Sequence, residues 1–279
     1  MRLRLFGDLH YSKNYLQLAD FEAKRDIYFA KFFEKLFEVE ADYYISLGDL
    51  TNTGDLCEWQ GVYDLLRKHQ AVDHFLLTVG NHDAYSLTKA QLEEFLAQPL
   101  YRAIEVDDYL LIFLDTSREK DFFDWSGYLD QDQFTWLENL LNNHRDKHLI
   151  VFGHHPLYNT TLFSNTEKAS VVPQVGLKEI LDQHLKPSLY LCGHVHADSI
   201  VHEGQWTYIQ LAAVLDQPCV RELEISDGQV SISSYNLDET DRQKGTWLGA
   251  NMAYFNLVDR GFQGLHNRNL EFDWEDIIY

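Results

Sequence analysis

Five short polar clusters, each directly after a short apolar run, constrain the fold of this chain more than any other feature. They are Asp8-Leu9-His10, Gly48-Asp49, Gly80-Asn81-His82-Asp83, Gly153-His154-His155-Pro156 and Gly193-His194-Val195-His196. An apolar run that gives way to such a cluster is typical of a strand that ends in a loop. Together the loops supply a mixed oxygen and nitrogen donor set, which suits borderline divalent metals.

The pattern between the clusters alternates between strand-like and helix-like segments. Strands are predicted at 3–6, 43–47, 74–79, 109–114, 148–152 and 189–192, and helices at 16–40, 55–69, from Thr88 onward, 130–145 and 174–185. Thr88 and Gln91 have the spacing of a helix capping box. This alternation predicts an α/β fold with a parallel or mixed sheet and helices outside it. All five clusters then fall at the carboxyl ends of strands, where functional groups of such folds gather.

The C-terminal third changes character. Short alternating segments at 206–211, 219–225 and 229–233 predict strands, with Asp227-Gly228 as a hairpin turn. We expect one domain over 1–234. The remaining segment, 235–279, has no clear period but carries Trp247, Tyr254, Phe255, Phe262, Phe272, Trp274 and Tyr279. Solvating so many aromatics is costly, so this extension is expected to pack on its own domain, or alternatively on a partner in a homodimer or over a substrate pocket.

Charge and cysteine content narrow the classes of function. The formal net charge is -21, from 23 Lys and Arg against 44 Asp and Glu. Such a balance disfavours nucleic acid and anionic membranes as partners and favours a small-molecule substrate. The three cysteines form no CxxC pair, which favours a reducing cytoplasm. A cleaved signal peptide would also remove the first cluster, so a cytoplasmic location is expected.

The donors can be arranged around two metal ions about 3.5–4 Å apart. A bridging group needs two hard oxygens, and Asp49 is the candidate. One ion would take Asp8, His10 and His196; the other would take Asn81, His194 and a histidine of the fourth cluster. Two divalent ions leave an excess of two positive charges over these carboxylates, which suits a hydroxide and a monoanionic phosphodiester. Water bound to such a metal can lose a proton near pH 7.

Other residues of the clusters are candidates for supporting roles. His82 is expected to contact phosphate or to protonate the leaving oxygen. Asp83 could hydrogen-bond an imidazole and fix its tautomer. His155 and Asn52 are candidates for contacts behind the ligands or with the substrate.

The ordered series Asp-x-His, Gly-Asp, Gly-Asn-His-Asp, His-x-Pro and Gly-His-x-His resembles that of the calcineurin-like metallophosphoesterase superfamily, over about 3–211. The resemblance implies a four-layer α/β/β/α sandwich, mixed sheets flanked by helices, with two metal ions (Mn, Fe, Zn or Co). It also selects His154 over His155 as ligand. The run Gly48-Asp49-Leu50-Thr51-Asn52-Thr53-Gly54 looks like the small bacterial cyclic-nucleotide and glycerophosphodiester phosphodiesterases. Asn52 stands where purple acid phosphatases carry a ligand tyrosine, which disfavours that subfamily.

Three functions remain open at this stage. A phosphodiesterase acting on a small diester such as a 3′,5′-cyclic nucleotide fits the series best. A phosphomonoesterase on a small metabolite or phosphoprotein would use the same ions. A non-catalytic binding scaffold would be expected to lack a ligand or His82, and this chain lacks neither.

Overall fold

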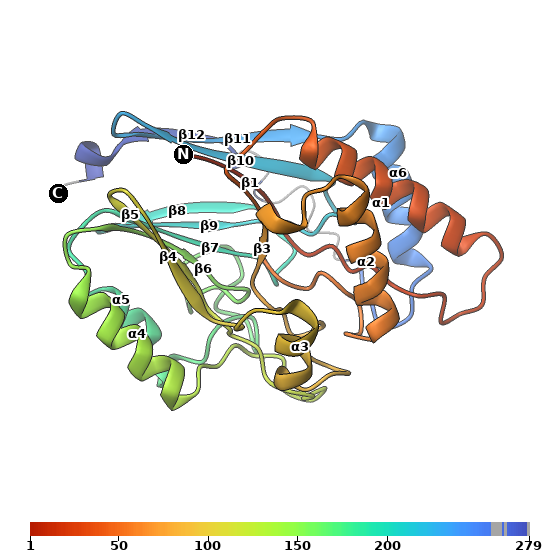
Figure 1. Cartoon of the computed structure of the whole chain (residues 1–279), viewed down its shortest axis with the longest axis horizontal. Coiled ribbons are helices and arrows are strands. Elements are labelled where there is room, and N and C mark those ends of the chain that lie inside the picture. The colour runs from red at the N-terminus through yellow and green to blue at the C-terminus, as the bar shows by residue number, and fades with distance from the viewer. Residues whose placement is uncertain (258–263, 265–266, 278–279) are drawn as a thin grey trace.

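Two six-stranded sheets lie face to face and helices cover their outer faces (Figure 1). The computed structural model describes residues 1–257, 264 and 267–277. The first sheet has the order β12 (Leu270–Asp273), β11 (Gln229–Asn236), β10 (Cys219–Ser226), β1 (Arg2–Phe6), β2 (Tyr43–Ser46) and β3 (Phe75–Leu77). The second has the order β4 (Arg102–Val106), β5 (Tyr109–Phe113), β6 (His148–Phe152), β7 (Ser188–Cys192), β9 (Trp206–Gln210) and β8 (Ser199–Glu203). The predicted four-layer sandwich is confirmed.

Both sheets are mixed, and their parallel strands position the loops of the five clusters. In the first sheet β1 runs parallel to β2, and β2 to β3. In the second sheet β5, β6, β7 and β9 are parallel to their neighbours in that order. Antiparallel strands complete the edges, with β10, β11 and β12 on the first sheet and β4 and β8 on the second.

Alternation along the strands divides the core into three layers. Leu3, Leu5 and Ile45 face Phe113 and Phe152 in the layer between the sheets. The other face of the first sheet packs against α1 (Phe21–Phe37), α2 (Leu56–Lys68) and α6 (Glu239–Ala250). The other face of the second sheet packs against α4 (Gln131–Asn143) and α5 (Leu177–Leu181). Because side chains alternate between the two faces of a strand, each strand contributes to the layer between the sheets and to the layer under the helices on its other face.

Helix starts follow the local signals. The predicted capping box is present at α3 (Lys89–Leu96), where the Thr88 hydroxyl accepts from the amide of Gln91 and the Gln91 side chain accepts from the amide of Thr88. Asp130 caps α4 by accepting from the amide of Gln133. Asp55 caps α2 in the same manner. Each cap satisfies backbone donors that the first helical turn cannot pair.

The structure differs from the sequence-based expectation at five elements, one of which is the unpredicted edge strand β12. Helix α5 is much shorter than the predicted 174–185, because Gly176 lies in the left-handed region and separates it from a 3-10 turn at Pro173–Val175. Strands β4 and β8 were not predicted; both are edge strands whose side chains are largely only partly buried. Helix α6 was not predicted either, since Gly245 and Gly249 disfavour a helix.

The described residues of 235–279 pack against the rest of the chain. Helix α6 lies along α1 (Figure 1), where Gly245 lets Tyr28 approach closely. Lys31 on α1 forms an ion pair with the buried Asp241 on α6. Strand β12 pairs with β11. Of the aromatics singled out above, Phe262 and Tyr279 lie outside the described residues. Within the described part of the chain, no helix has both the length and the apolar character that crossing a membrane requires.

Candidate metal centre

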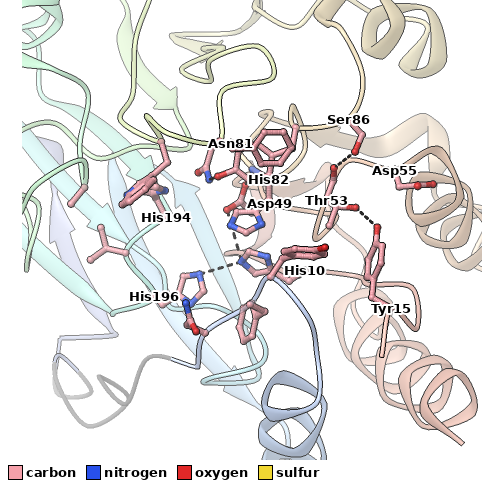
Figure 2. A pocket seen from close by; sticks show the side chains of 18 of the residues that line it. His10, Tyr15, Asp49, Thr53, Asp55, Asn81, His82, Ser86, His194 and His196 are labelled. Atoms are coloured by element: carbon pink, nitrogen blue, oxygen red, sulfur yellow. Dashed lines mark hydrogen bonds and ion pairs between the residues drawn. The ribbon is translucent and has the colours of Figure 1, made fainter. Parts of the chain in front are cut away.

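The ends of five strands bring the predicted donor residues together in one place (Figure 2). Asp8 and His10 follow β1, Asp49 follows β2, and Asn81 lies beyond β3. From the facing sheet, His154 follows β6, and His194 and His196 follow β7. The loops are also tied to each other, because the carbonyl of Asp49 accepts from the amides of Leu9 and His10 at 3.0 and 2.9 Å.

One donor group consists of Asp8, His10 and His196. The Nε2 atom of His196 lies 3.1 Å from Asp8 Oδ2 and 3.2 Å from His10 Nε2. All three side chains are buried. Ligand atoms of these residues lie within 4.8 Å of one another, close enough to share an ion. His10 and His196 reach this point from left-handed backbone, with φ of 52° and 57°.

A second donor group surrounds His154. Its Nε2 atom lies 3.1 Å from Asn81 Oδ1, 3.2 Å from His194 Nδ1 and 3.3 Å from Asp49 Oδ2. The opposite nitrogen, Nδ1, donates to the carbonyl of Leu47 at 2.8 Å. His194 is held in a similar manner, since its Nε2 donates to the carbonyl of Lys168 at 3.1 Å. Both imidazoles therefore turn an unprotonated nitrogen toward the same centre.

Asp49 lies between the two groups. Its Oδ2 atom is 3.3 Å from His154 Nε2 and 3.8 Å from His10 Nε2. The other oxygen, Oδ1, accepts from the amide of His82 at 2.8 Å. Glycine is required at position 80, because a Cβ there would overlap the Asp49 carboxylate. The backbone thus fixes the one carboxylate that faces both groups.

These donors fit cations better than they fit each other. With Nδ1 of His154 and Nε2 of His194 committed to carbonyls, two nitrogen lone pairs face each other at 3.2 Å. The first group converges in the same way, because Nε2 of His196 lies 3.1 Å from the buried Asp8 Oδ2 and 3.2 Å from Nε2 of His10. Buried lone pairs that converge without donors are costly unless a proton or a metal ion lies among them. The donor set suits two such ions.

Without metal, protons take that place on some of these histidines. Burial lowers the pKa of His154, but attraction to Asp49 outweighs it and raises the pKa to about 9. Burial likewise opposes protonation of His196, yet its bonds to Asp216 and Asp8 raise the pKa to about 10. The pKa of His194 instead falls to about 4, because burial and the neighbouring His154 both disfavour its charge. The site therefore combines histidines of opposite proton affinity around shared carboxylates.

His155 lies beside the second group, and its nitrogens are engaged elsewhere. Its Nδ1 accepts from the Thr116 hydroxyl at 2.8 Å, and its Nε2 donates to the carbonyl of Trp125 at 3.0 Å. It is close enough to His154 and His194 to be grouped with them. Both its lone pair and its N–H are already used, whereas Nε2 of His154 faces Asn81 and Asp49.

His82 points into the cavity from the third cluster (Figure 2). Its Nδ1 donates to the carbonyl of Asn52 at 2.6 Å, so its Nε2 is the nitrogen left to face a ligand. The ring lies edge-on to His10, with centroids 4.6 Å apart. Asn52 itself is buried, and its side-chain amide donates to the backbone carbonyl of Ala253 at 2.8 Å.

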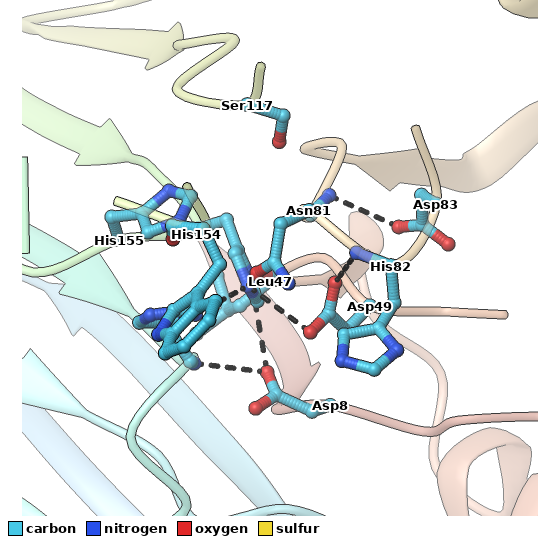
Figure 3. Close-up of polar contacts among 12 residues, drawn as sticks. Asp8, Leu47, Asp49, Asn81, His82, Asp83, Ser117, His154 and His155 are labelled. Carbon is cyan, nitrogen blue, oxygen red and sulfur yellow. Dashed lines mark hydrogen bonds and ion pairs between the residues drawn. The ribbon is translucent and has the colours of Figure 1, made fainter. Parts of the chain in front are cut away.

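Asp83 differs from its expected role of orienting an imidazole. Its carboxylate, labelled in Figure 3, accepts from the amides of Leu50, Thr51 and Gly80 and from the Thr51 hydroxyl, at 2.7–3.1 Å. Burial and the negative charge of Asp49 raise its pKa to about 7. Asp83 therefore joins the loops of the second and third clusters. A carboxylate outside the five clusters, Asp216, contacts the far side of a site imidazole instead, with its Oδ2 2.9 Å from His196 Nδ1.

Two features of the site carried no signal in the sequence. Asp216 belongs to no cluster and lies in a loop between β9 and β10. Residues 253–256 belong to the segment without clear period, yet Phe255 packs on both His10 and His196, with centroids 4.7 and 5.6 Å apart. The aromatic content of that segment was the only available hint.

Several of the donor residues line a cavity of about 860 Å³, a size typical of small-molecule sites. Besides the donors, its walls include six aromatic side chains: Tyr15, Tyr85, Phe122, Trp125, Tyr254 and Phe255. Asp55 and Glu167 lie on the walls as well, whereas the described wall residues include no Lys or Arg. The cavity thus offers aromatic surface and two donor groups, without a Lys or Arg among the described wall residues.

A sandwich of this topology with these donor groups defines a class of metal-dependent phosphoesterases, and the chain belongs to the calcineurin-like phosphoesterase family, whose model matches residues 1–198. A probable glycerophosphodiester phosphodiesterase from Arcobacter nitrofigilis is 25% identical over 159 residues, which is 56% of each chain. The chain thus matches about half the length of that relative. A probable cyclic nucleotide phosphodiesterase from Synechococcus is 26% identical over 68% of this chain and 72% of its own.

Solved structures with the same fold include proteins of different description. A dimetal phosphatase from Danio rerio has a TM-score of 0.61 and 13% identity, over 85% of this chain and 96% of that one. GAP50, described as the anchor in the inner membrane complex of Plasmodium, has a TM-score of 0.53 and 14% identity, over 91% and 96%. At such identity the likeness shows the fold alone.

Proposed function

We propose that this protein is a dinuclear metal-dependent phosphodiesterase that hydrolyses small phosphodiesters such as a 3′,5′-cyclic nucleotide. One observation carries the proposal: the Asp49 carboxylate lies between two groups of buried donors, 3.3 Å from His154 Nε2 and 3.8 Å from His10 Nε2. The names of the two curated relatives support a diester as substrate.

In this proposal Asp8, His10 and His196 hold one ion, and Asn81, His154 and His194 hold the other. Asp49 bridges the two. The ions, divalent or trivalent and drawn from Mn, Fe, Zn or Co, supply Lewis-acid activation of the phosphoryl group and of water. The buried carbonyls of Leu47 and Lys168 keep the ligating nitrogens of His154 and His194 unprotonated and correctly aimed.

His82 serves the leaving group. Because Asn52 accepts from Nδ1, the ring presents Nε2 to the cavity. From there it can contact a phosphoryl oxygen or, when protonated, give its proton to the departing oxygen. The backbone amide of His82 donates a hydrogen bond to Asp49, and this bond links the position of His82 to that of the bridging carboxylate.

The charge of the cavity favours a diester over a monoester. A diester carries one negative charge at neutral pH, whereas a monoester carries nearly two. The described walls offer no Lys or Arg for a second charge, and they add Glu167, besides Asp55, whose charge is paired with Lys13. A single charge opposite the two ions, with uncharged groups on the aromatic walls, suits these surroundings.

The test compares one leaving group on two substrates. Manganese-loaded protein is expected to hydrolyse bis(p-nitrophenyl) phosphate with a higher kcat/KM than p-nitrophenyl phosphate, and a chelator should abolish both reactions. Asn81→Ala should lose most activity, while Asn139→Ala, on the exposed face of α4, should lose none. Absence of diester hydrolysis with manganese, iron, zinc and cobalt would contradict the proposal, and a preference for the monoester would support the alternative phosphomonoesterase.

We also propose that the protein works in the reducing cytoplasm, which is supported by its three free cysteines. For the extension 235–279 we propose a role in completing the catalytic domain of 1–234, which is supported by the contacts of Ala253 and Phe255 with Asn52, His10 and His196.

A further inference from the structure

One wall of the cavity comes from residues 253–256, which follow α6 and lie well beyond the family-matched 1–198. We call these residues the C-terminal wall. Tyr254, Phe255 and Asn256 line the cavity together with residues of the family-matched region. The family match therefore says nothing about what this wall binds, and its own side chains have to be considered.

The backbone of the wall is fixed on both sides of Tyr254. Before it, the carbonyl of Ala253 accepts from the buried amide of Asn52 at 2.8 Å. After it, Phe255 is 8% exposed and packs on His10 and His196. Between these anchors Tyr254 adopts a φ of 61°, which is unfavourable for a bulky side chain. Tyr254 is nevertheless 73% exposed and lines the cavity, so the strained backbone presents an aromatic side chain to the cavity instead of burying it.

Tyr15 completes this surface from the loop before α1. Its ring meets that of Tyr254 edge-on, with centroids 5.5 Å apart and an interplanar angle of 83°. The Tyr15 hydroxyl is 2.5 Å from Thr53 Oγ1, and Lys13 Nζ lies 4.8 Å from its ring centroid. Lys13 in turn forms an ion pair with Asp55 at 2.6 Å. Tyr15 is thus held in place before any ligand arrives, which lowers the entropic cost of binding to it.

A second aromatic pair of the cavity wall, Tyr85 and Phe122, is less available. Tyr85 and Phe122 stack on each other, with centroids 4.5 Å apart and ring planes at 24°. One face of each ring is therefore already covered. Tyr15 and Tyr254, which meet at nearly a right angle, form a corner that a flat group can enter while contacting both rings.

From this arrangement, and resting on the proposed phosphodiesterase function, we propose that Tyr254 and Tyr15 form a subsite for a flat aromatic group of the substrate. An aryl ester of the phosphoryl group, or a nucleoside ester whose base enters the corner, is the chemical class that fits. Tyr254 then determines specificity: it contacts the substituent, while the donor residues contact the phosphoryl group.

Two small monoanions that cannot be hydrolysed test the subsite. Methylphenylphosphinate and dimethylphosphinate share the charge and both oxygens and differ only in the phenyl group. Calorimetry with manganese-loaded protein should show at least about fivefold tighter binding of the phenyl compound. Tyr254→Ala should remove this preference and leave dimethylphosphinate binding unchanged. Tyr254→Phe should retain it, as should Tyr158→Ala, whose tyrosine is 48% exposed and lies outside the cavity wall.

Three results would overturn the subsite: no phenyl preference in the unaltered protein, a preference that survives Tyr254→Ala, or a preference that disappears in Phe122→Ala instead. The third result would place the subsite at Tyr85 and Phe122. The outcome is separate from that of the catalytic proposal, because the phosphinates report binding alone. Phenyl preference without hydrolysis of bis(p-nitrophenyl) phosphate would leave the subsite standing and reject the phosphodiesterase; hydrolysis without phenyl preference would do the reverse.

Discussion

The Oδ2 atom of Asp216 lies 2.9 Å from Nδ1 of His196, and this contact turns the other nitrogen of the ring toward Asp8. Strands β8 and β9 of the second sheet lie between the two residues in the chain, and Asp216 belongs to the loop that then leads to β10 of the first sheet. A carboxylate behind a ligating imidazole fixes its tautomer and strengthens it as a donor.

Replacing Asp216 with Asn should therefore weaken metal binding without unfolding the protein. We expect the manganese affinity to fall about 10- to 100-fold, measured by titration of metal-free protein. Asp227→Asn, in the exposed hairpin turn between β10 and β11, is the matched control and should change nothing. Equal affinities for the two variants would show that Asp216 does not support the centre.

Gly193→Ala should displace a donor directly. A Cβ at this position would overlap Asp8 Oδ1, so the carboxylate has to move. We expect loss of bound metal and a fall in diester hydrolysis of about 100-fold or more, because the charge stabilisation that the metals supply is worth several kcal/mol. Elemental analysis of folded protein is the measurement. Gly204→Ala, where a Cβ meets nothing within 4 Å, should keep its metal; equal metal content in both would argue against the assignment of Asp8.

Asn52→Ala should loosen the C-terminal wall. The substitution removes the donor to the carbonyl of Ala253 and is expected to cost about 1 kcal/mol. Hydrogen exchange of residues 251–257 should become faster, and kcat/KM should fall because Phe255 no longer packs firmly on His10. Asn139→Ala on α4 is the control for an asparagine side chain that bonds only within its helix. Unchanged exchange at 251–257 would be inconsistent with this anchor.

Helix α6 should depend on the small size of Gly245. A Cβ there would lie 2.5 Å from the Tyr28 hydroxyl, which donates to the carbonyl of Val214 at 2.7 Å. We expect Gly245→Ala to lower the free energy of unfolding by about 2 kcal/mol, and Tyr28→Phe by about 1 kcal/mol. The double variant should lose less than the two single losses together, because the overlap with the hydroxyl is gone. Strict additivity in urea unfolding would contradict a close α1–α6 contact.

The stabilising effect of Asp55 should depend on pH. Its ion pair with Lys13 and its cap of α2 lower its pKa to about 2, below the unfolded-state value of about 3.9. The ionised form therefore stabilises the fold above about pH 4, and this contribution is lost as the pH falls toward 2. Asp55→Ala should cost about 1 kcal/mol at pH 6, after allowance for solvent screening, and less at pH 3. Urea unfolding at the two pH values measures the difference; a constant loss would indicate that the cap does not titrate in this range.

The sequence predicts most of the architecture because its signals are local. Apolar runs followed by polar clusters mark the strands that carry donors, and Thr88 and Asp130 mark helix starts. Helix α6 could not be recognised, since Gly245 and Gly249 lower its intrinsic helix propensity. Glycine suits these two positions because Tyr28 and Phe255 pack closely against them. Strands β4 and β8, at sheet edges with partly exposed side chains, lack the clear apolar pattern on which strand prediction rests.

In the metal centre, too, the features that follow from local sequence could be predicted, and those that depend on tertiary packing could not. The donor positions follow from strand ends, which are local, and from a resemblance that selects His154 over His155. The reason for that selection is tertiary, because it depends on Thr116 and Trp125 engaging both nitrogens of His155. Asp216 and Tyr254 reach the centre only through the packing of distant segments, so no short pattern identifies them.

The pairing of β1 with β10 has a consequence for biosynthesis. Leu3 pairs in register with Leu223, so one edge of the first strand waits for a neighbour that is translated 220 residues later. At about 5–20 residues per second, its free edge stays open for roughly 10–40 seconds on the ribosome. During that interval the nascent chain presents an apolar strand with one unpaired edge, and its safe maturation should depend on molecular chaperones more than that of a protein whose strands pair as they emerge.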